Sequence, residues 1–186
     1  EGLKDSGVSV INIGMGPTPM TYFAHYHFEA DAAVMLTGSH NPSEYNGFKM
    51  VFNKHSFYAE DIQSLQKIID NNELELLDGQ IIKKDITKEY IARDLLNISL
   101  NRKLKVAWDP GNGAMGRVTR DIVEKLINSE NIIINEEVDG NFPNHHPDPT
   151  VPKNMIQLIE TVKENSCDIG LAFDGDGDRL GVIDNL

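Results

Sequence analysis

Cysteine and long apolar stretches are scarce in this 186-residue sequence. Cys167 is the only cysteine, which excludes an internal disulfide and zinc sites built from several thiolates. A single cysteine fits the reducing cytoplasm, which is the compartment that we predict. No apolar run approaches the roughly 18 residues of a membrane span, and the first residues, EGLKDSG, do not resemble a secretory signal, so we expect no membrane partner. Because the sequence opens with Glu1 and enters a strand pattern at once, we also expect it to be a fragment.

Basic residues are scarce as well. The 17 Lys and Arg residues stand against 29 Asp and Glu residues, which gives a formal net charge of −12. The basic residues form no cluster, and an acidic surface repels phosphate backbones, so we exclude nucleic acid as a partner. The composition, 40% hydrophobic and 25% charged, is typical of a globular protein with a buried core.

Short β-branched apolar runs alternate with longer helical patterns along the chain, which is typical of parallel sheets covered by helices. The pattern predicts strands at residues 8–13, 32–36, 48–52, 104–108, 132–135, 168–173 and 179–183. It predicts helices at residues 17–28, 59–72, 86–98 and 115–128, and a last helix that ends near Asn165. We therefore expect an α/β fold of two units, residues 1–85 and 86–186, with mostly parallel sheets. Ligands of such sheets bind at the carboxyl ends of strands, so the loops there are the candidate sites.

The loop after the predicted strand 168–173 is acidic and rich in glycine, with the sequence DGDGDR. Its carboxylates, Asp174, Asp176 and Asp178, occupy alternate positions, and the intervening glycines let the backbone turn so that the carboxylates can converge. Three converging carboxylates require a cation, and hard oxygen ligands select magnesium, calcium or manganese over zinc or copper. A solvated acidic turn is the simpler alternative, but the two flanking apolar strands favour a metal site.

An EF-hand calcium loop also begins with alternating aspartates. It requires Gly at position six and Glu at position twelve, where this sequence has Arg179 and Asn185. The flanking segments are predicted strands rather than helices, so the calcium-sensor interpretation is excluded. Arg179 indicates instead that a phosphate binds beside the acidic loop, because a guanidinium matches phosphate oxygens in bidentate fashion.

A second candidate loop, TGSHNPSEYNGFK (37–49), follows the predicted strand 32–36. The hydrolase elbow G-x-S-x-G around Ser39 would need Gly at position 41, which is Asn41. His40 cannot be assumed to be the base for Ser39, because sequence neighbours usually point apart. Lys49 could lower the pKa of a reacting hydroxyl or neutralise a phosphate. The asparagine, proline and glycine residues are equally typical of a plain turn, so this loop alone leaves both interpretations open.

The third candidate loop, DPGNGAMG (109–116), matches the dinucleotide fingerprint. Gly111, Gly113 and Gly116 have G-x-G-x-x-G spacing between a predicted strand and a predicted helix. Glu136 lies near the end of the next strand, where a ribose-binding acid is expected. The alternative function is therefore an NAD-linked oxidoreductase or a nucleotide-binding module. The fingerprint is short and common, and nicotinamide chemistry does not require the neighbouring metal loop.

The segment DGNFPNHHPDP contains possible zinc ligands in Asp139, His145, His146 and Asp148. Four prolines lie between residues 143 and 152. Because proline fixes the backbone, we interpret this segment as a rigid interdomain loop rather than a second metal site.

Four ordered motifs, TGSHNPSEYNGFK, DPGNGAMG, DGNFPNHHPDPTVPKN and AFDGDGDRLGV, resemble the α-D-phosphohexomutase superfamily over nearly the whole chain. The YNGFK form of the serine loop is similar to the bacterial phosphomannomutase/phosphoglucomutase group. The resemblance implies that Ser39 is the phosphoserine and a Mg²⁺ ligand. It implies that Asp174, Asp176 and Asp178 are further Mg²⁺ ligands and that Arg179 lies next to the phosphate. It also implies that His40 and Lys49 take part in proton handling and phosphoserine contacts.

The same resemblance implies a reversible transfer of a phosphoryl group between phosphoserine and a hexose phosphate. A hexose bisphosphate would be the intermediate, and hexose 1- and 6-phosphates would be interconverted. It also implies a four-domain protein, of which this chain matches only the latter part of domain 1 and domain 2. The missing domains 3 and 4 would be partners of this chain, so we expect the isolated fragment to be inactive.

Overall fold

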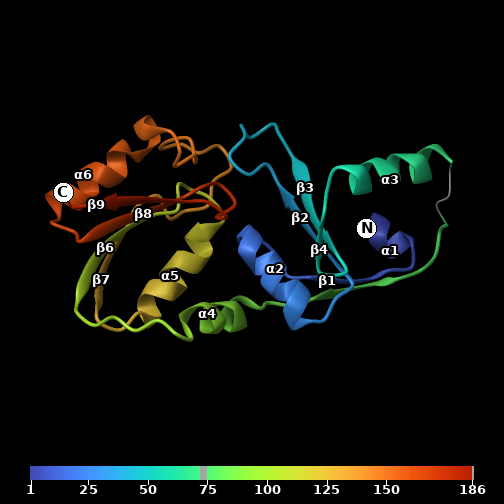
Figure 1. Cartoon of the computed structure of the whole chain (residues 1–186), viewed down its shortest axis with the longest axis horizontal. Coiled ribbons are helices and arrows are strands. Elements are labelled where there is room, and N and C mark those ends of the chain that lie inside the picture. The colour runs from blue at the N-terminus through green and yellow to red at the C-terminus, as the bar shows by residue number, and fades with distance from the viewer. Residues whose placement is uncertain (72–74, 186) are drawn as a thin grey trace.

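The computed structural model describes residues 1–71 and 75–185 and confirms the α/β class (Figure 1). The second unit is built on one sheet with the strand order β7-β6-β8-β9. Strands β7 and β8 run parallel to the central strand β6, and β9 runs antiparallel to β8. The strands are β6 (Leu104–Asp109), β7 (Ser129–Ile133), β8 (Ile169–Phe173) and β9 (Leu180–Asp184).

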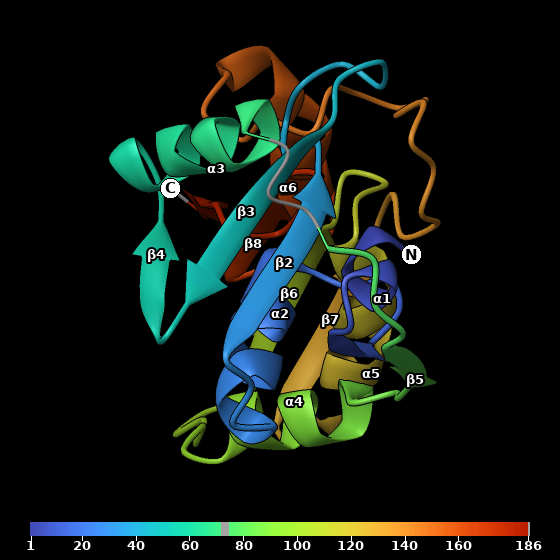
Figure 2. The ribbon, with the colours of Figure 1, turned by 90° about the vertical axis from the view of Figure 1, so that its right-hand side faces the viewer.

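The described part of residues 1–85, called the first unit below, contains two smaller sheets. Strand β1 (Ser9–Asn12) pairs in parallel with β5 (Gln80–Lys83). Strands β2 (Ala32–Thr37), β3 (Gly47–Phe52) and β4 (His55–Phe57) form an antiparallel sheet. Figure 2 shows the β2–β3 hairpin in front of the second unit. Its register pairs Thr37 with Gly47 and Met35 with Lys49, so the hairpin returns Lys49 to the end of β2 that carries the serine loop.

Helix α6 covers one face of the large sheet. It packs on β6, β8 and β9, and the core beneath it contains Ala107, Met155, Leu158, Val162, Cys167 and Ala172. A Cβ on Gly170 would lie 2.7 Å from Val162, so a glycine is required for helix and strand to approach this closely. The helical elements of this unit are α4 (Thr87–Leu95), α5 (Met115–Lys125), the 3₁₀-helix η1 (Pro152–Met155) and α6 (Ile156–Glu164).

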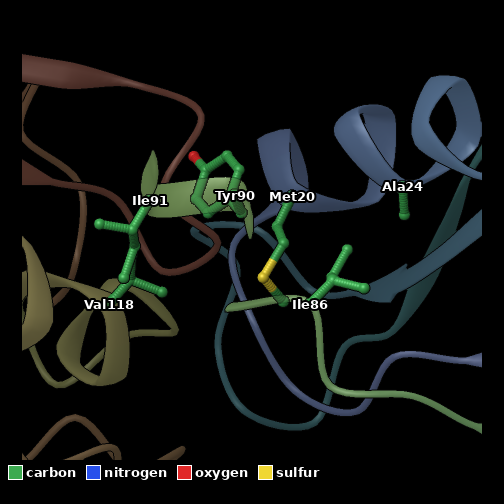
Figure 3. Close-up of a cluster of buried hydrophobic side chains, with 6 residues drawn as sticks. All are labelled: Met20, Ala24, Ile86, Tyr90, Ile91 and Val118. Atoms are coloured by element: carbon green, nitrogen blue, oxygen red, sulfur yellow. The ribbon is translucent and has the colours of Figure 1, made fainter. Parts of the chain in front are cut away.

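A second core joins the two units (Figure 3). Met20 and Ala24 come from helix α2 (Thr18–His27) of the first unit, and they pack with Ile86, Tyr90 and Ile91 at α4 and with Val118 of α5. Ile91 and Met20 are almost completely buried, and each such side chain contributes about 1.5–3 kcal/mol. This shared core orients α2 so that its first turn meets the loop between β8 and β9 (Figure 1).

Most predicted elements are present, but some bounds differ. Strand β7 begins at Ser129, earlier than the predicted 132–135, because pairing with β6 includes the polar residues before the apolar run. The predicted helix 59–72 corresponds to α3 (Glu60–Asp70), and residue 72 lies outside the described residues. The spacing of its apolar residues is helical, yet Ile62 and Ile69 are 46% and 61% exposed.

Three short elements were not predicted, namely α1 (Gly2–Asp5), β4 and β5. None of the described helices is long and apolar enough to span a membrane.

Candidate functional site

The acidic loop joins β8 to β9, and its three carboxylates converge. One oxygen each of Asp174, Asp176 and Asp178 lies within 4.8 Å of the other two. Asp174 organises the loop, because its Oδ1 accepts hydrogen bonds from the backbone N–H groups of Asp178 and Arg179, both at 3.0 Å. Asp174 and Asp176 are buried, whereas Asp178 is exposed. Within residues 1–71 and 75–185, this triad is the one group of His, Cys, Asp and Glu side chains that could hold a metal ion.

Ser39 lies in the loop after β2, and its hydroxyl reaches the acidic loop. Ser39 Oγ is 3.3 Å from Asp174 Oδ2 and 3.2 Å from Asp176 Oδ1. Its φ of +53° is a left-handed conformation that is uncommon for a residue other than glycine. The Ser39 N–H donates to Thr37 Oγ1 at 2.7 Å, which helps to hold this conformation. Such conformations cost roughly 1–3 kcal/mol and cluster at functional sites.

Arg179 and His40 lie beside the same hydroxyl, and Lys49 contacts the neighbouring carboxylates. Arg179 Nη2 lies 3.3 Å from Ser39 Oγ, and Arg179 Nε donates to Asp174 Oδ2 at 3.0 Å. His40 Nδ1 lies 3.4 Å from Ser39 Oγ, so this neighbour in sequence also faces the hydroxyl. Lys49 Nζ donates to Asp176 Oδ2 at 2.7 Å and pairs with Asp178. The structure therefore brings together the residues that the phosphohexomutase resemblance implied, namely Ser39, His40, Lys49, Asp174, Asp176, Asp178 and Arg179.

The charges of the cluster shift several pKa values. Burial, together with the nearby charges of Asp176 and Asp178, raises the pKa of Asp174 to about 6. Burial would also raise the pKa of Asp176, but hydrogen bonds from Lys49 and Thr18 outweigh it, so this pKa is lowered. Burial disfavours the Lys49 ammonium, yet the hydrogen bonds and charges of Asp176 and Asp178 raise its pKa. The site is thus a set of carboxylates that attracts positive charge.

The donor set fits a hard divalent cation. Carboxylate oxygens of Asp174, Asp176 and Asp178, one from each residue, lie within 4.8 Å of one another, and the hydroxyl oxygen of Ser39 lies beside Asp174 and Asp176. No described sulfur or imidazole group belongs to the triad. Oxygen-only sites of this kind suit Mg²⁺, Ca²⁺ or Mn²⁺. A divalent cation would also offset the repulsion between the carboxylates, which adds to burial in raising the pKa of Asp174.

Two glycines bring three loops into backbone contact. A Cβ on Gly113 would lie 2.6 Å from the carbonyl oxygen of Gly175, and a Cβ on Gly175 would lie 2.2 Å from the carbonyl oxygen of Ser39. The carbonyl oxygen of Gly175 also accepts a hydrogen bond from the N–H of Ala114 at 2.9 Å. The serine loop, the acidic loop and the glycine-rich turn therefore form one assembly, in which glycine is needed for close approach.

The glycine-rich turn uses its N–H groups internally. Gly111 N donates to Asp109 Oδ1, Asn112 N to the carbonyl oxygen of Asn135, and Gly113 N to that of Pro110, at 2.8–2.9 Å. A bound pyrophosphate would need such groups to be free. Glu136, the expected ribose ligand, forms an ion pair with Arg120 instead. The dinucleotide alternative is not supported.

The proline-rich segment 139–152 joins β7 to η1 within the second unit, so the interpretation as an interdomain connection is wrong. His145 Nε2 lies 2.8 Å from Asp109 Oδ2, and His145 Nδ1 lies 3.0 Å from the carbonyl oxygen of His146. The hydrogen bond to Asp109, opposed by burial, raises the pKa of His145. Pro147, two residues on, lies against the positions of Gly111 and Gly175, so the segment supports the acidic loop from outside.

Two threonines were missed by the sequence analysis. Thr18 Oγ1 and Thr37 Oγ1 both donate to Asp176 Oδ2, at 2.7 Å and 3.1 Å. A threonine at the start of a helix or the end of a strand carries no distinctive pattern. Only Thr37 could have been singled out from the sequence, because it is the first residue of the serine motif.

Comparisons with known proteins show the family that this chain resembles. Residues 1–76 match the family described as phosphoglucomutase/phosphomannomutase, alpha/beta/alpha domain I, and residues 87–186 match domain II of the same family. A phosphomannomutase/phosphoglucomutase of Pseudomonas putida is 48% identical over 185 residues, covering 100% of this chain and 40% of the relative. A phosphoglucomutase of Neisseria gonorrhoeae is 45% identical, covering 98% of this chain and 40% of the relative.

A solved structure is also similar. The crystal structure of a phosphoglucomutase/phosphomannomutase family protein from Burkholderia thailandensis superposes with a TM-score of 0.92 at 41% identity, covering 99% of this chain and 42% of that one. The chain therefore belongs to the phosphoglucomutase/phosphomannomutase family, within the phosphohexomutase fold class that its sheets and helices define. It spans about 40% of the length of the curated relatives that it matches.

Proposed function

We propose that the protein containing this chain interconverts hexose 1- and 6-phosphates by moving a phosphoryl group between Ser39 and the sugar. The observation that carries the proposal is the position of Ser39 Oγ. It lies 3.2–3.4 Å from Asp174, Asp176, His40 and Arg179. The hydroxyl is therefore adjacent both to two carboxylates of the candidate cation site and to two basic side chains. Relatives named phosphomannomutase/phosphoglucomutase support this chemistry.

In this proposal Mg²⁺ is the cofactor, held by Asp174, Asp176, Asp178 and a phosphate oxygen on Ser39. Bound Mg²⁺ would neutralise the phosphoserine and stabilise charge on the transferring oxygens. A phosphoserine carries a charge of about −1.5 to −2, which the three carboxylates alone would repel. Arg179 would supply further positive charge at the serine, and Lys49 would supply it at the neighbouring carboxylates. Arg179 can also bind phosphate oxygens in bidentate fashion.

In the proposed reaction, phosphoserine at Ser39 donates its phosphoryl group to the sugar. A sugar hydroxyl attacks the phosphorus of phosphoserine, the Oγ–P bond breaks, and the product is a hexose bisphosphate. His40, whose Nδ1 lies 3.4 Å from Ser39 Oγ, would accept the proton of the attacking hydroxyl and return it to that oxygen. The bisphosphate then reorients in the site and transfers its other phosphoryl group to Ser39. The cycle therefore consumes no nucleotide.

We also propose that two domains, which meet at residue 85, contribute different parts of the site. Residues 1–85 would supply the reacting serine, and residues 86–186 would supply the metal loop. Recognition of the sugar and of its far phosphate would fall to further domains, because this chain accounts for only 40% of the relatives' length. The binding partners of this site would be hexose phosphates and hexose bisphosphates.

Isotope transfer tests the proposal. The intact protein, incubated with a hexose bisphosphate carrying labelled phosphate, should acquire label on Ser39. Ser39→Ala should abolish labelling, whereas Ser43→Ala, which changes an exposed serine of the same loop, should not. Label on a residue other than Ser39 would overturn the proposal. Saturable NAD binding that Gly113→Val removes would favour the dinucleotide alternative.

A further inference from the structure

The first residue of α2 makes two hydrogen bonds to the middle aspartate of the acidic loop. The N–H of Thr18 donates to the carbonyl oxygen of Asp176 at 2.8 Å, and Thr18 Oγ1 donates to Asp176 Oδ2 at 2.7 Å. Thr18 is 0% exposed and Asp176 is 2% exposed, so water does not compete for these bonds. The two residues are 158 positions apart and belong to different units.

The two oxygens of Asp176 have separate tasks. Oδ2 accepts hydrogen bonds from Thr18, Thr37 and Lys49, whereas Oδ1 faces Ser39 Oγ at 3.2 Å. A carboxylate is planar, so fixing the carbonyl oxygen of Asp176 and its Oδ2 also fixes the direction of Oδ1. The hydrogen bonds of Thr18 therefore orient Oδ1 toward the serine without contacting Oδ1 itself.

Thr18 differs from the other two donors to Oδ2 in how firmly it is held. Lys49 is a flexible side chain with 29% of its surface exposed, and an ammonium can move to an arriving phosphate. Thr37 already accepts a hydrogen bond from Ser39 N, so its hydroxyl is tied to the reacting loop. Thr18 begins a ten-residue helix whose Met20 and Ala24 are packed in the core shared with α4 and α5.

We propose that Thr18 is a positioning residue for Asp176, through which the first unit orients a metal ligand of the second. The inference rests on the proposed function, because it takes Asp176 as a Mg²⁺ ligand. The hydroxyl would keep Oδ1 turned toward Ser39, where a cation would bind, even if Lys49 moved from Oδ2 to a phosphate. The positive end of the α2 dipole further favours the negative carboxylate at this position. Partners of this outer kind usually contribute about 10–100-fold to metal affinity.

Calorimetric titration of the intact, unphosphorylated protein with MgCl₂ measures the effect. Thr18→Val removes the hydroxyl and keeps the shape, and we expect it to weaken Mg²⁺ binding about tenfold or more. Thr18→Ser retains the hydroxyl and should bind almost as the wild type does. The matched control is Thr119→Val, because Thr119 is also 0% exposed and its hydroxyl donates to a backbone carbonyl, that of Met115 at 2.8 Å. This control should leave the affinity unchanged.

A double-mutant cycle separates positioning from general destabilisation. In an Asp176→Asn background, Thr18→Val should cause no further loss of affinity, because its effect acts through the carboxylate. If Thr18→Val does not fold, Thr18→Ala removes the same hydroxyl without placing a methyl group against Asp176. Wild-type affinity in a folded Thr18→Val or Thr18→Ala protein, or an additive loss in the cycle, would overturn the inference. Absence of Mg²⁺ binding in the wild type would instead contradict the proposed function.

Discussion

Ser39 Oγ and Asp176 Oδ1 lie 3.2 Å apart, although 137 positions separate the two residues. Each comes from a different unit, and each loop is shaped by its own unit: the β2–β3 hairpin for Ser39 and the β8–β9 hairpin for Asp176. The chemistry therefore depends on how closely the two units approach each other. That approach is set by backbone contact as much as by the side chains.

Substituting Gly175 tests this dependence. In Gly175→Ala the new Cβ would lie 2.2 Å from the carbonyl oxygen of Ser39, so the serine and acidic loops must separate. We expect overpacking to lower the free energy of unfolding by about 1–3 kcal/mol and to weaken Mg²⁺ binding. Gly140→Ala is the matched control, because a Cβ there meets nothing within 4 Å. Denaturant unfolding and calorimetry check both effects, and equal behaviour of the two variants would contradict the prediction.

Removing one carboxylate tests the metal site itself. Asp176→Asn deletes a charge from the triad but retains an oxygen, and we expect Mg²⁺ affinity to fall by more than the roughly 10–100-fold typical of losing an outer partner. Glu44→Gln removes one negative charge from an exposed residue of the serine loop and controls for long-range attraction. Unchanged Mg²⁺ affinity of Asp176→Asn in calorimetry would eliminate the assignment.

Lys49 should affect metal binding and phosphoryl transfer in opposite directions. Its ammonium pairs with Asp176 and Asp178 and so competes with a cation for the same carboxylates. We expect Lys49→Met to tighten Mg²⁺ binding about tenfold, or ~1.4 kcal/mol, while slowing phosphorylation of Ser39. Lys54→Met, at an exposed lysine of the β3–β4 turn, is the control. Weaker Mg²⁺ binding in Lys49→Met would show that the lysine assists the metal rather than competing with it.

How much of this site the sequence predicts depends on whether a pattern is local. The strand–loop–strand context of Asp174, Asp176 and Asp178 was readable, because the alternation of carboxylates and glycines lies within six residues. The positions of Ser39 and Lys49 follow from one hairpin. The α/β class was equally predictable, since it depends on the alternation of apolar strands and helices along the chain.

Contacts between distant segments were not predictable. The bond from Thr18 to Asp176 depends on how α2 docks against the second unit, and nothing in the residues around Thr18 marks that docking. The partner of His145 was likewise missed, because Asp109 belongs to another motif. Glycine spacing at Gly113 suggested a ligand, but its physical cause is the close approach of Gly175. The same pattern thus served packing rather than nucleotide binding.

The pair of His145 and Asp109 predicts a pH-dependent stability. The pKa of His145 is raised above its usual 6.5, so the ion pair stabilises the fold fully below about pH 6.5 and is lost as the pH rises through the higher folded pKa. We expect His145→Gln to lower the free energy of unfolding by about 1.5–3 kcal/mol at pH 5.5 and by less at pH 8.5. Chemical denaturation at the two pH values measures this, with the exposed His55→Gln as control. An equal loss at both would rule out the ion pair.

The isolated chain should bind Mg²⁺ but should not turn over substrate. It contains the serine, the metal loop and the groups around them, yet it spans only 40% of its relatives' length. Phosphoryl transfer depends mainly on positioning and electrostatic stabilisation, and the binding energy of remote parts of the substrate supports the reacting centre. Without groups that hold the far phosphate and the sugar hydroxyls, the substrate has no fixed orientation toward Ser39. Residues 1–186 should therefore show Mg²⁺ binding in calorimetry and negligible mutase activity, which the remaining domains should restore when supplied. Interconversion of hexose 1- and 6-phosphates by residues 1–186 alone, at a rate near that of the intact protein, would show that these residues already contain a complete sugar site.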